Sequence, residues 1–443
     1  IYSKDLYILS EISAASVQII PEYHYDPQGF MRNFTIKDLN EQSDKLSNDS
    51  KIADFAAEFN IKYNLEPEMI SGSGAYKLKE IKTSQHIILE LKEDWWGNKL
   101  EAEHMKAYPE QVIYKIISDK NSAILALKSN ELDVLSRMLP ENFQELKDEP
   151  EIVKRFNLTS PDQFTYVYIG FNCKNPKLDL LTRKAIGHVT NRERIIDLTF
   201  GGLATEVNSP ISPLKAHCHK GLTDMNFDLV KAKELLAESG WADSDGDGIL
   251  DKEIEGKRVP LSLAFKYPSS SSSAKNIGLL IQEEAERVGI EFKLVAREWT
   301  VMLEETKKRD FDMFFAGWSA APIPDDLKQI WHTSSDTYDG SNRVGFGTEA
   351  TDKIIDEIRV TLDETKRNEL YQTIQEEIHK EYPYIFLFAP KNCIAVSKRF
   401  ENTNTYSLRP GYFPMRFKLK ESVAKRANKN TAEEKKEEKT ETH

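Results

Sequence analysis

The sequence predicts an α/β fold, and three observations support this prediction. Strand-like segments alternate with amphipathic helical segments along most of the 443 residues. The clearest run is a strand at residues 261–267, a helix at 274–288 and a strand at 290–295, an order that implies a parallel crossover unit. Hydrophobic residues make up 40% of the chain and charged residues 30%, a balance typical of soluble globular proteins.

The other elements each have a local signal. Expected strands are short and rich in β-branched and aromatic residues, whereas expected helices repeat apolar residues three and four positions apart. Residues 181–200 read as one helix, helix 228–238 ends before Gly240, and the polar residues 41–54 predict a loop. In chain order, the remaining expected elements are strands at 112–117, 132–134, 311–315 and 383–389, a helix at 121–130 and two helices within 352–381.

Composition excludes several classes of function. The net charge of −12 argues against nucleic acid as the main partner, because phosphate binding needs a basic face. The most apolar stretches, such as residues 384–390, are far shorter than the roughly 18 residues that a membrane span requires. The three cysteines are too few and too widely spaced for a disulfide framework or a zinc pattern.

The two ends of the chain have different compositions. Residues 419–443 are dense in charges of both signs and poor in large apolar side chains, so we expect a disordered charged tail. The chain begins at Ile1 and shows no secretory leader, which decides nothing about the natural N-terminus.

Four carboxylates follow the pattern DxDxDGxxD, formed by Asp243, Asp245, Asp247 and Asp251. Acids at alternate loop positions with a glycine at the turn are typical of a Ca²⁺ loop, which would here be structural. The twelfth position of such a loop is Ile254 rather than glutamate. An acidic turn without metal therefore stays an open alternative.

Catalytic signals are missing from the sequence. It contains no GxSxG, HExxH, phosphate-binding loop or GxGxxG pattern, and we expect no organic cofactor and no enzymatic activity. The adjacent acids Asp325 and Asp326 could be suggested as an acid and a base, but neighbouring loop residues usually point apart.

The region after the strand at 311–315 is the best candidate for binding. Trp318 is followed by the small residues Ser319 and Ala320, which leaves backbone groups open beside an aromatic wall. This arrangement suits an extended ligand that pairs as an added strand. A tryptophan that belongs to the core is the alternative.

Several runs in this order resemble one known family. They are GSGAYKL at 72–78, WWG at 95–97, Phe171-Asn172, LTRKAI at 181–186, Asn191-Arg192, GGLA at 201–204, SPISP at 209–213, AKELLAESGW at 232–241 with the Asp-Gly turn, FDMFFAGW at 311–318 and Pro383-Tyr384. Across about residues 15–418 the chain resembles the extracellular solute-binding proteins of family 5, the dipeptide- and oligopeptide-binding components of ABC importers.

The resemblance implies a two-lobed periplasmic-binding-protein-like clamp of type II, in the large peptide-binding class. It implies lobe I at 1–168, lobe II at 169–387 and a return to lobe I at 388–418, with crossings near Tyr168 and Ala389. The implied ligand residues are Trp318, Ser319 and Ala320, then Tyr76 and Phe388, with Asp325 as a partner for an amine.

Two departures from the family pattern are visible. The family's N-terminal region has no counterpart here, so we expect the chain to be a fragment or a processed part. Peptide-binding members carry an aspartate shortly after the Gly-Trp pair, where this sequence has Ala321.

The resemblance also implies a function. We expect a monomeric substrate-binding protein that captures a peptide or a related small solute and delivers it to the membrane permease of an ABC importer. We expect it outside the cytoplasmic membrane, in the periplasm or on the cell surface, anchored as a lipoprotein. A surface lipoprotein that binds a non-peptide ligand or a partner protein is the alternative, and a hydrolase is the class least supported.

Overall fold

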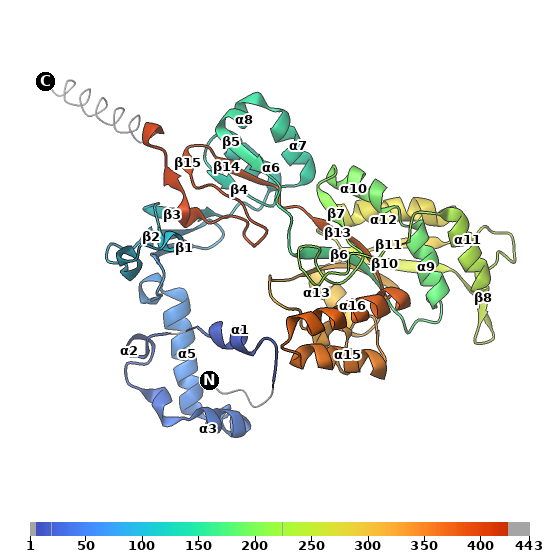
Figure 1. Cartoon of the computed structure of the whole chain (residues 1–443), viewed down its shortest axis with the longest axis horizontal. Coiled ribbons are helices and arrows are strands. Elements are labelled where there is room, and N and C mark those ends of the chain that lie inside the picture. Colours follow the sequence, from blue (N-terminus) through green and yellow to red (C-terminus); the bar gives the residue numbers. More distant parts are fainter. Residues whose placement is uncertain (1–5, 19, 224, 424–443) are drawn as a thin grey trace.

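The chain forms two lobes in the computed structural model, which describes residues 6–18, 20–223 and 225–423 (Figure 1). Lobe II is built on a six-stranded sheet with β10 parallel to both of its neighbours and antiparallel pairing from β12 onward. Its strands, in spatial order, are β11 (Glu291–Arg297), β10 (Ser262–Pro268), β12 (Met313–Ser319), β6 (Thr165–Phe171), β13 (Tyr384–Pro390) and β7 (Ala204–Glu206).

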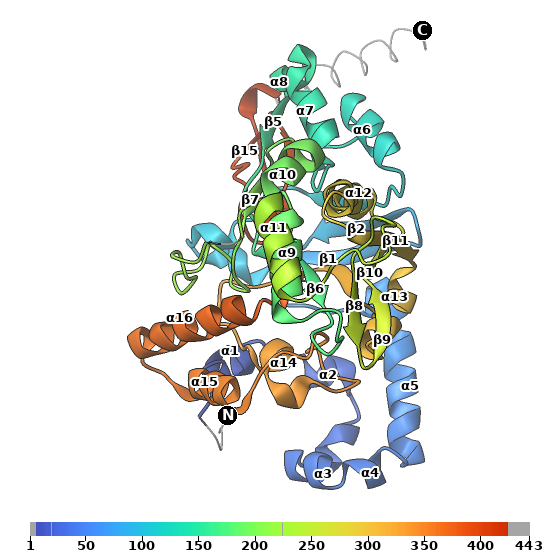
Figure 2. The same ribbon diagram turned by 90° about the vertical axis from the view of Figure 1, so that its right-hand side faces the viewer.

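Helices cover both faces of this sheet (Figures 1 and 2). Successive strand residues point to opposite faces, so Met313 belongs to one core and Phe314 to the other. The first core is closed by α9 (Leu180–Val189), α10 (Arg192–Phe200), α11 (Leu229–Glu238) and α12 (Ser272–Glu286). The second is closed by α14 (Lys328–Trp331), α15 (Glu349–Val360) and α16 (Glu364–Glu381). The hairpin β8 (Asp251–Ile254) and β9 (Lys257–Pro260) and helix α13 (Trp299–Lys307) complete lobe II.

Lobe I contains two small sheets. One has the order β4 (Val134–Leu135), β14 (Ile394–Ser397), β5 (Phe156–Thr159), and it packs with α6 (Lys120–Lys128), α7 (Pro140–Asp148) and α8 (Pro150–Arg155). The other is the meander of β1 (Tyr76–Lys82), β2 (His86–Leu91) and β3 (Gln111–Lys115). The pair β15 (Phe400–Glu401) and β16 (Lys418–Leu419) lies at the C-terminal side.

Residues before the first sheet form helices α1 (Ser10–Ala15), α2 (Glu22–Tyr25), α3 (Ile36–Glu41), α4 (Ser43–Leu46) and α5 (Ser50–Leu65). The predicted loop at 41–54 is therefore wrong. The Thr35 hydroxyl accepts the Asp38 N–H in a capping box, and the Asp49 carboxylate accepts the Lys51 N–H at the start of α5. These caps satisfy helix N-terminal donors that composition alone assigned to a loop.

The crossings between the lobes differ slightly from the expected positions. Tyr168 lies in the middle of β6 and Ala389 lies in β13, where it pairs with Thr205 of β7. Both residues are therefore part of the lobe II sheet. The chain crosses at residues 160–164 and again at 391–393, just outside the paired strands.

Other sequence expectations have mixed outcomes. The expected helix at 181–200 is two helices, because Asn191 leaves the helical conformation and its side chain accepts the Arg194 N–H as a new cap. The expected tail at 419–443 begins too early, since Leu419 pairs with Phe400. Residues 424–443 lie outside the described part of the chain. Within the described ranges, no helix is both long and apolar enough to span a bilayer.

Buried Arg183 of α9 links this helix to the chain segment that enters β13. Its guanidinium donates to three carbonyl oxygens, of Leu178 at 2.6 Å, Glu381 at 2.6 Å and Tyr382 at 3.1 Å. Tyr382 is in the left-handed conformation with φ +50°, and the two bonds to residues 381 and 382 hold this sharp end of α16 in place.

We predict that Arg183→Ala lowers the free energy of unfolding by about 3 kcal/mol, because buried carbonyls lose their donors. Urea unfolding followed by circular dichroism measures this change. The matched control is Lys231→Ala, which removes an exposed cation of α11 and should leave the unfolding midpoint nearly unchanged. Equal midpoints for the two variants would contradict the structural role of Arg183.

Candidate functional site

The second half of β12 has one uncovered edge. Along its whole length β12 pairs with β6, but on the other side only Met313 and Phe314 pair with β10. In the described part of the chain no strand pairs with residues 315–319 along this edge. A strand that pairs on one side only can accept a further strand on the other.

The register decides which backbone groups face the open edge. Asn172 N–H donates to Asp312 O, and Ala320 N–H donates to Phe164 O, so even-numbered residues exchange hydrogen bonds with β6. Gly317 and Ser319 therefore direct their N–H and C=O groups to the open edge, and both residues are exposed.

Gly317 keeps this edge close to its neighbour. A Cβ atom at this position would lie 3.0 Å from the carbonyl oxygen of Tyr166 on β6. A side chain here would crowd the backbone of the adjacent strand, so the absence of one lets the two strands stay in register beside the open edge.

Trp318 is half-buried and packs against the second core of lobe II. Its indole Nε1 is buried beside the phenols of Tyr168 and Tyr384. Nearby, the rings of Tyr168 and Tyr384 stack with centroids 3.8 Å apart, and burial raises the pKa of both phenols. Most of the contacts therefore favour the core alternative, and an aromatic wall for a ligand stays a prediction.

Ser319 is the last residue of β12, and Ala320 follows it near the first crossing between the lobes. The Ser319 hydroxyl lies 3.3 Å from the Thr165 hydroxyl of β6. Together with Trp318 they are the predicted ligand residues that the structure brings to the open edge. Thr165 was missed by the sequence analysis.

Asp325 does not fit its predicted role as a partner for a ligand amine. One carboxylate oxygen accepts a hydrogen bond from Lys215 Nζ at 2.6 Å, and the other lies 2.7 Å from His217 Nε2. The Lys215 side chain is only 4% exposed, and the His217 ring stacks on Tyr371. The carboxylate is thus already neutralised inside lobe II.

The other two predicted ligand residues lie elsewhere. Phe388 is fully buried in the first core, where its ring packs against Phe200, so it cannot line an open cleft in this structure. Tyr76 belongs to the β1–β3 sheet, and its hydroxyl donates to Pro109 O at 2.8 Å. Burial raises the pKa of Tyr76 to about 12. In the described part of the chain, no hydrogen bond joins Tyr76 to β12.

A turn of lobe I at residues 406–411 reaches the same end of β12. Tyr406 N–H donates to Gly411 O at 2.9 Å, which closes the turn. At its tip the exposed Arg409 donates to Thr165 Oγ1 at 3.2 Å. The Arg-Pro-Gly sequence predicts a turn, but nothing in it indicates which part of lobe II the turn approaches.

Three of the four carboxylates predicted to form a Ca²⁺ loop lie close together in the structure. Asp243, Asp245 and Asp247 bring carboxylate oxygens within 4.8 Å of one another, and all three are exposed. Asp251 lies apart in β8, where its carboxylate accepts from Ser244 and pairs with Arg258. Its inclusion in the ligand set is therefore wrong, and Ca²⁺ binding by the other three stays a prediction.

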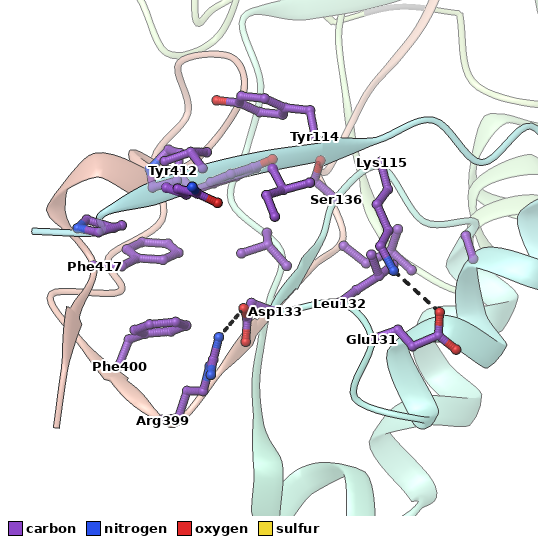
Figure 3. Close-up of a pocket in the computed structure, with 18 of the residues that line it drawn as sticks. Tyr114, Lys115, Glu131, Leu132, Asp133, Ser136, Arg399, Phe400, Tyr412 and Phe417 are labelled. Carbon is purple, nitrogen blue, oxygen red and sulfur yellow. Dashed lines mark hydrogen bonds and ion pairs between the residues drawn. The ribbon is translucent and has the colours of Figure 1, made fainter. Parts of the chain in front are cut away.

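A hollow of about 510 Å³ lies in lobe I between the outer edges of β3 and β4 (Figure 3). Tyr114, Phe400 and Phe417 line it, and the ion pairs Lys115–Glu131 and Arg399–Asp133 lie at its side. None of the predicted ligand residues lines this hollow. It is therefore a feature separate from the open edge of β12.

Comparison with known proteins identifies the family. Residues 10–341 match the family model described as bacterial extracellular solute-binding proteins, family 5 middle. The chain belongs to this family. Its description as extracellular and solute-binding agrees with the two-lobed fold and with the resemblance found in the sequence.

Two curated relatives share 30% and 24% of their residues with this chain over the aligned parts. The oligopeptide-binding protein AppA of Bacillus subtilis is 30% identical over 351 residues, which are 77% of this chain and 60% of that protein. The nickel-binding periplasmic protein of Escherichia coli is 24% identical over 320 residues, which are 71% of this chain and 58% of that protein. The chain thus spans about three fifths of the length of these curated relatives.

Solved structures of the family share the fold. The AppA structure from Bacillus subtilis in complex with a nonapeptide has a TM-score of 0.70 at 27% identity and covers 94% of this chain and 75% of that chain. NikA from Brucella suis in complex with Fe(III)-EDTA has a TM-score of 0.69 at 22% identity, with 79% of this chain and 68% of that chain covered.

We predict that Asp325→Ala destabilises lobe II by about 3–5 kcal/mol, because the buried Lys215 ammonium loses its counter-charge. Urea unfolding measures this loss. The double variant Lys215→Met with Asp325→Leu should recover part of it, since no unpaired charge is then buried. If the Asp325 carboxylate were instead unpaired in the ligand-free protein and available to a ligand amine, Asp325→Ala would leave the unfolding midpoint unchanged.

Proposed function

We propose that this chain is the substrate-binding part of an ABC importer that captures an extended peptide along the open edge of β12. The observation that carries the proposal is the edge itself. Gly317 and Ser319 offer backbone donors and acceptors that no other strand of the described chain uses. An extended peptide would satisfy them by strand addition, which needs no particular side-chain sequence.

The position of the edge supports the same function. Ser319 lies at the end of β12 that is nearest the first crossing between the lobes. It is opposite Thr165, which contacts Arg409 in the turn of lobe I. A ligand placed there would contact both lobes. Closure is then favoured to the extent that the closed state makes more contacts with the ligand than the open state does.

The relatives support a peptide as the solute. AppA of Bacillus subtilis is named as an oligopeptide-binding protein, and its structure holds a nonapeptide. Other relatives are named for nickel and for heme. The open backbone edge of this chain favours a peptide over these solutes, because a peptide supplies matching donors and acceptors at the spacing of a strand.

Delivery and location complete the proposal. The protein would act as a monomer outside the cytoplasmic membrane, held to the membrane by a lipid anchor, and would pass its ligand to the membrane subunits of the importer. The family's description as extracellular supports the location. The role proposed for the open edge is binding; in the described residues the Ser319 hydroxyl lies 3.3 Å from the Thr165 hydroxyl.

Native mass spectrometry of the full chain with a tryptic peptide mixture tests the proposal. We expect additional peaks that are heavier by the masses of single peptides. A bare protein mass across the whole mixture would overturn peptide capture. Isothermal titration calorimetry with each bound peptide then gives the affinity of the complex.

We predict that Ser319→Pro lowers peptide affinity about tenfold or more, because proline removes the N–H on the open edge and places its ring there. The pairing with β6 should survive, since Ser319 does not exchange hydrogen bonds with that strand. Ser319→Ala is the matched control and keeps the N–H. Calorimetry measures affinity, and thermal unfolding verifies that both variants fold. Wild-type affinity in the proline variant would show that the ligand does not pair here.

A further inference from the structure

The guanidinium of Arg409 stands beside the open edge without an acidic partner. It donates one hydrogen bond, to Thr165 Oγ1, and that hydroxyl lies 3.3 Å from Ser319 Oγ. Among the described residues no aspartate or glutamate forms an ion pair with Arg409. A guanidinium carries five N–H donors, so most of its donor capacity is still available.

The acids of the surrounding segments already have cationic neighbours. Asp325 pairs with Lys215 and His217, and Asp326 pairs with Arg359. The Asp162 side chain is 44% exposed and lies 3.7 Å from Lys391. Asp325 and Asp326 are the first acids after β12 in the chain. At this strand end Arg409 therefore carries a positive charge that no acid of the described residues pairs with.

A second arginine, Arg137, lies in a turn that is joined to the second crossing through Asn392. Asn392 accepts the Arg137 N–H at its Oδ1 and donates from its Nδ2 to Pro410 O, the residue after Arg409. One buried side chain thus holds two arginine-bearing turns together. Arg137 is exposed, and in the described chain no ion pair involves it. These bonds join the backbones of the two turns, on a protein whose net charge is −12.

We propose that Arg409 binds a carboxylate at the end of the ligand that lies next to Ser319. This assignment rests on the proposed function and specifies which charge the ligand presents there. A guanidinium can hold a carboxylate through two parallel N–H···O bonds, which fixes orientation as well as charge. The site therefore selects a free carboxylate and makes no demand for a free amine.

Calorimetry on the full chain with three peptides tests this assignment. The probes are tetra-alanine, its C-terminal amide and its N-acetyl form. For the wild type we expect amidation to weaken binding about tenfold, because a charged hydrogen-bond partner is lost, and we expect N-acetylation to change little. In Arg409→Gln tetra-alanine should bind about as weakly as the amide, so the preference for the free carboxylate disappears.

Two further variants separate this role from a general effect of charge. Arg409→Lys keeps the positive charge without the planar fork and should recover part of the preference. Lys231→Gln removes the same unit of charge from α11 and should leave the preference unchanged. Thermal unfolding verifies that each variant folds.

The outcomes distinguish this inference from the proposed function. If the wild type binds the peptides but treats acid and amide equally, or if Arg409→Gln keeps the full preference, the carboxylate assignment is wrong and peptide capture stands. A large loss on N-acetylation would also overturn it. If the wild type binds none of the three peptides and no tryptic peptide either, peptide capture and the assignment are both wrong.

Discussion

The antiparallel pairing of β6 with β12 and β13 is the constraint on which the rest of the molecule depends. The first crossing leads into β6 and the second leaves from β13, so pairing these two strands places both crossings side by side. Pairing β6 with β12 over seven positions brings Ser319 opposite Thr165, at the same end. The two crossings and the open edge therefore lie at the same end of the sheet, because β6 pairs in antiparallel register with both of its neighbours, β12 and β13.

Burial of charge in lobe II determines what the strand end can recognise. The Lys215 ammonium is almost fully enclosed and is stable there only because Asp325 accepts its hydrogen bond and His217 shares the carboxylate. Asp326 is held in the same way by Arg359, with Tyr7 donating to it. Both acids that follow β12 thus serve the stability of the lobe, and the charge that we propose for solute binding, on Arg409, comes from the opposite lobe.

Features set by local sequence were predictable, and features set by distant contacts were not. Asp228 and Gly240 delimit α11 within thirteen residues. The strand predicted at 311–315 is found at Met313–Ser319, so Trp318 and Ser319 belong to the strand itself, and their role in ligand binding stays a prediction. The contact of Arg409 with Thr165 joins residues 244 positions apart, and Asp325 meets Lys215 across 110 positions. Phe388 was misplaced because a wholly apolar strand is typical of burial on both faces and does not indicate a residue that is open to a cleft.

Asn392 has a consequence for the geometry of lobe rotation. Its backbone N–H donates to Pro161 O at 2.9 Å, so the two crossings are joined to each other as well as to the turns at Arg137 and Pro410. A rigid rotation about an axis through these crossings moves each atom in proportion to its distance from that axis. Arg409 and Thr165 lie close to it and travel little, whereas the lobe tips sweep the longest arcs. If the proposed carboxylate site is correct, the charged end of the ligand would be bound at a point that moves little when the lobes rotate.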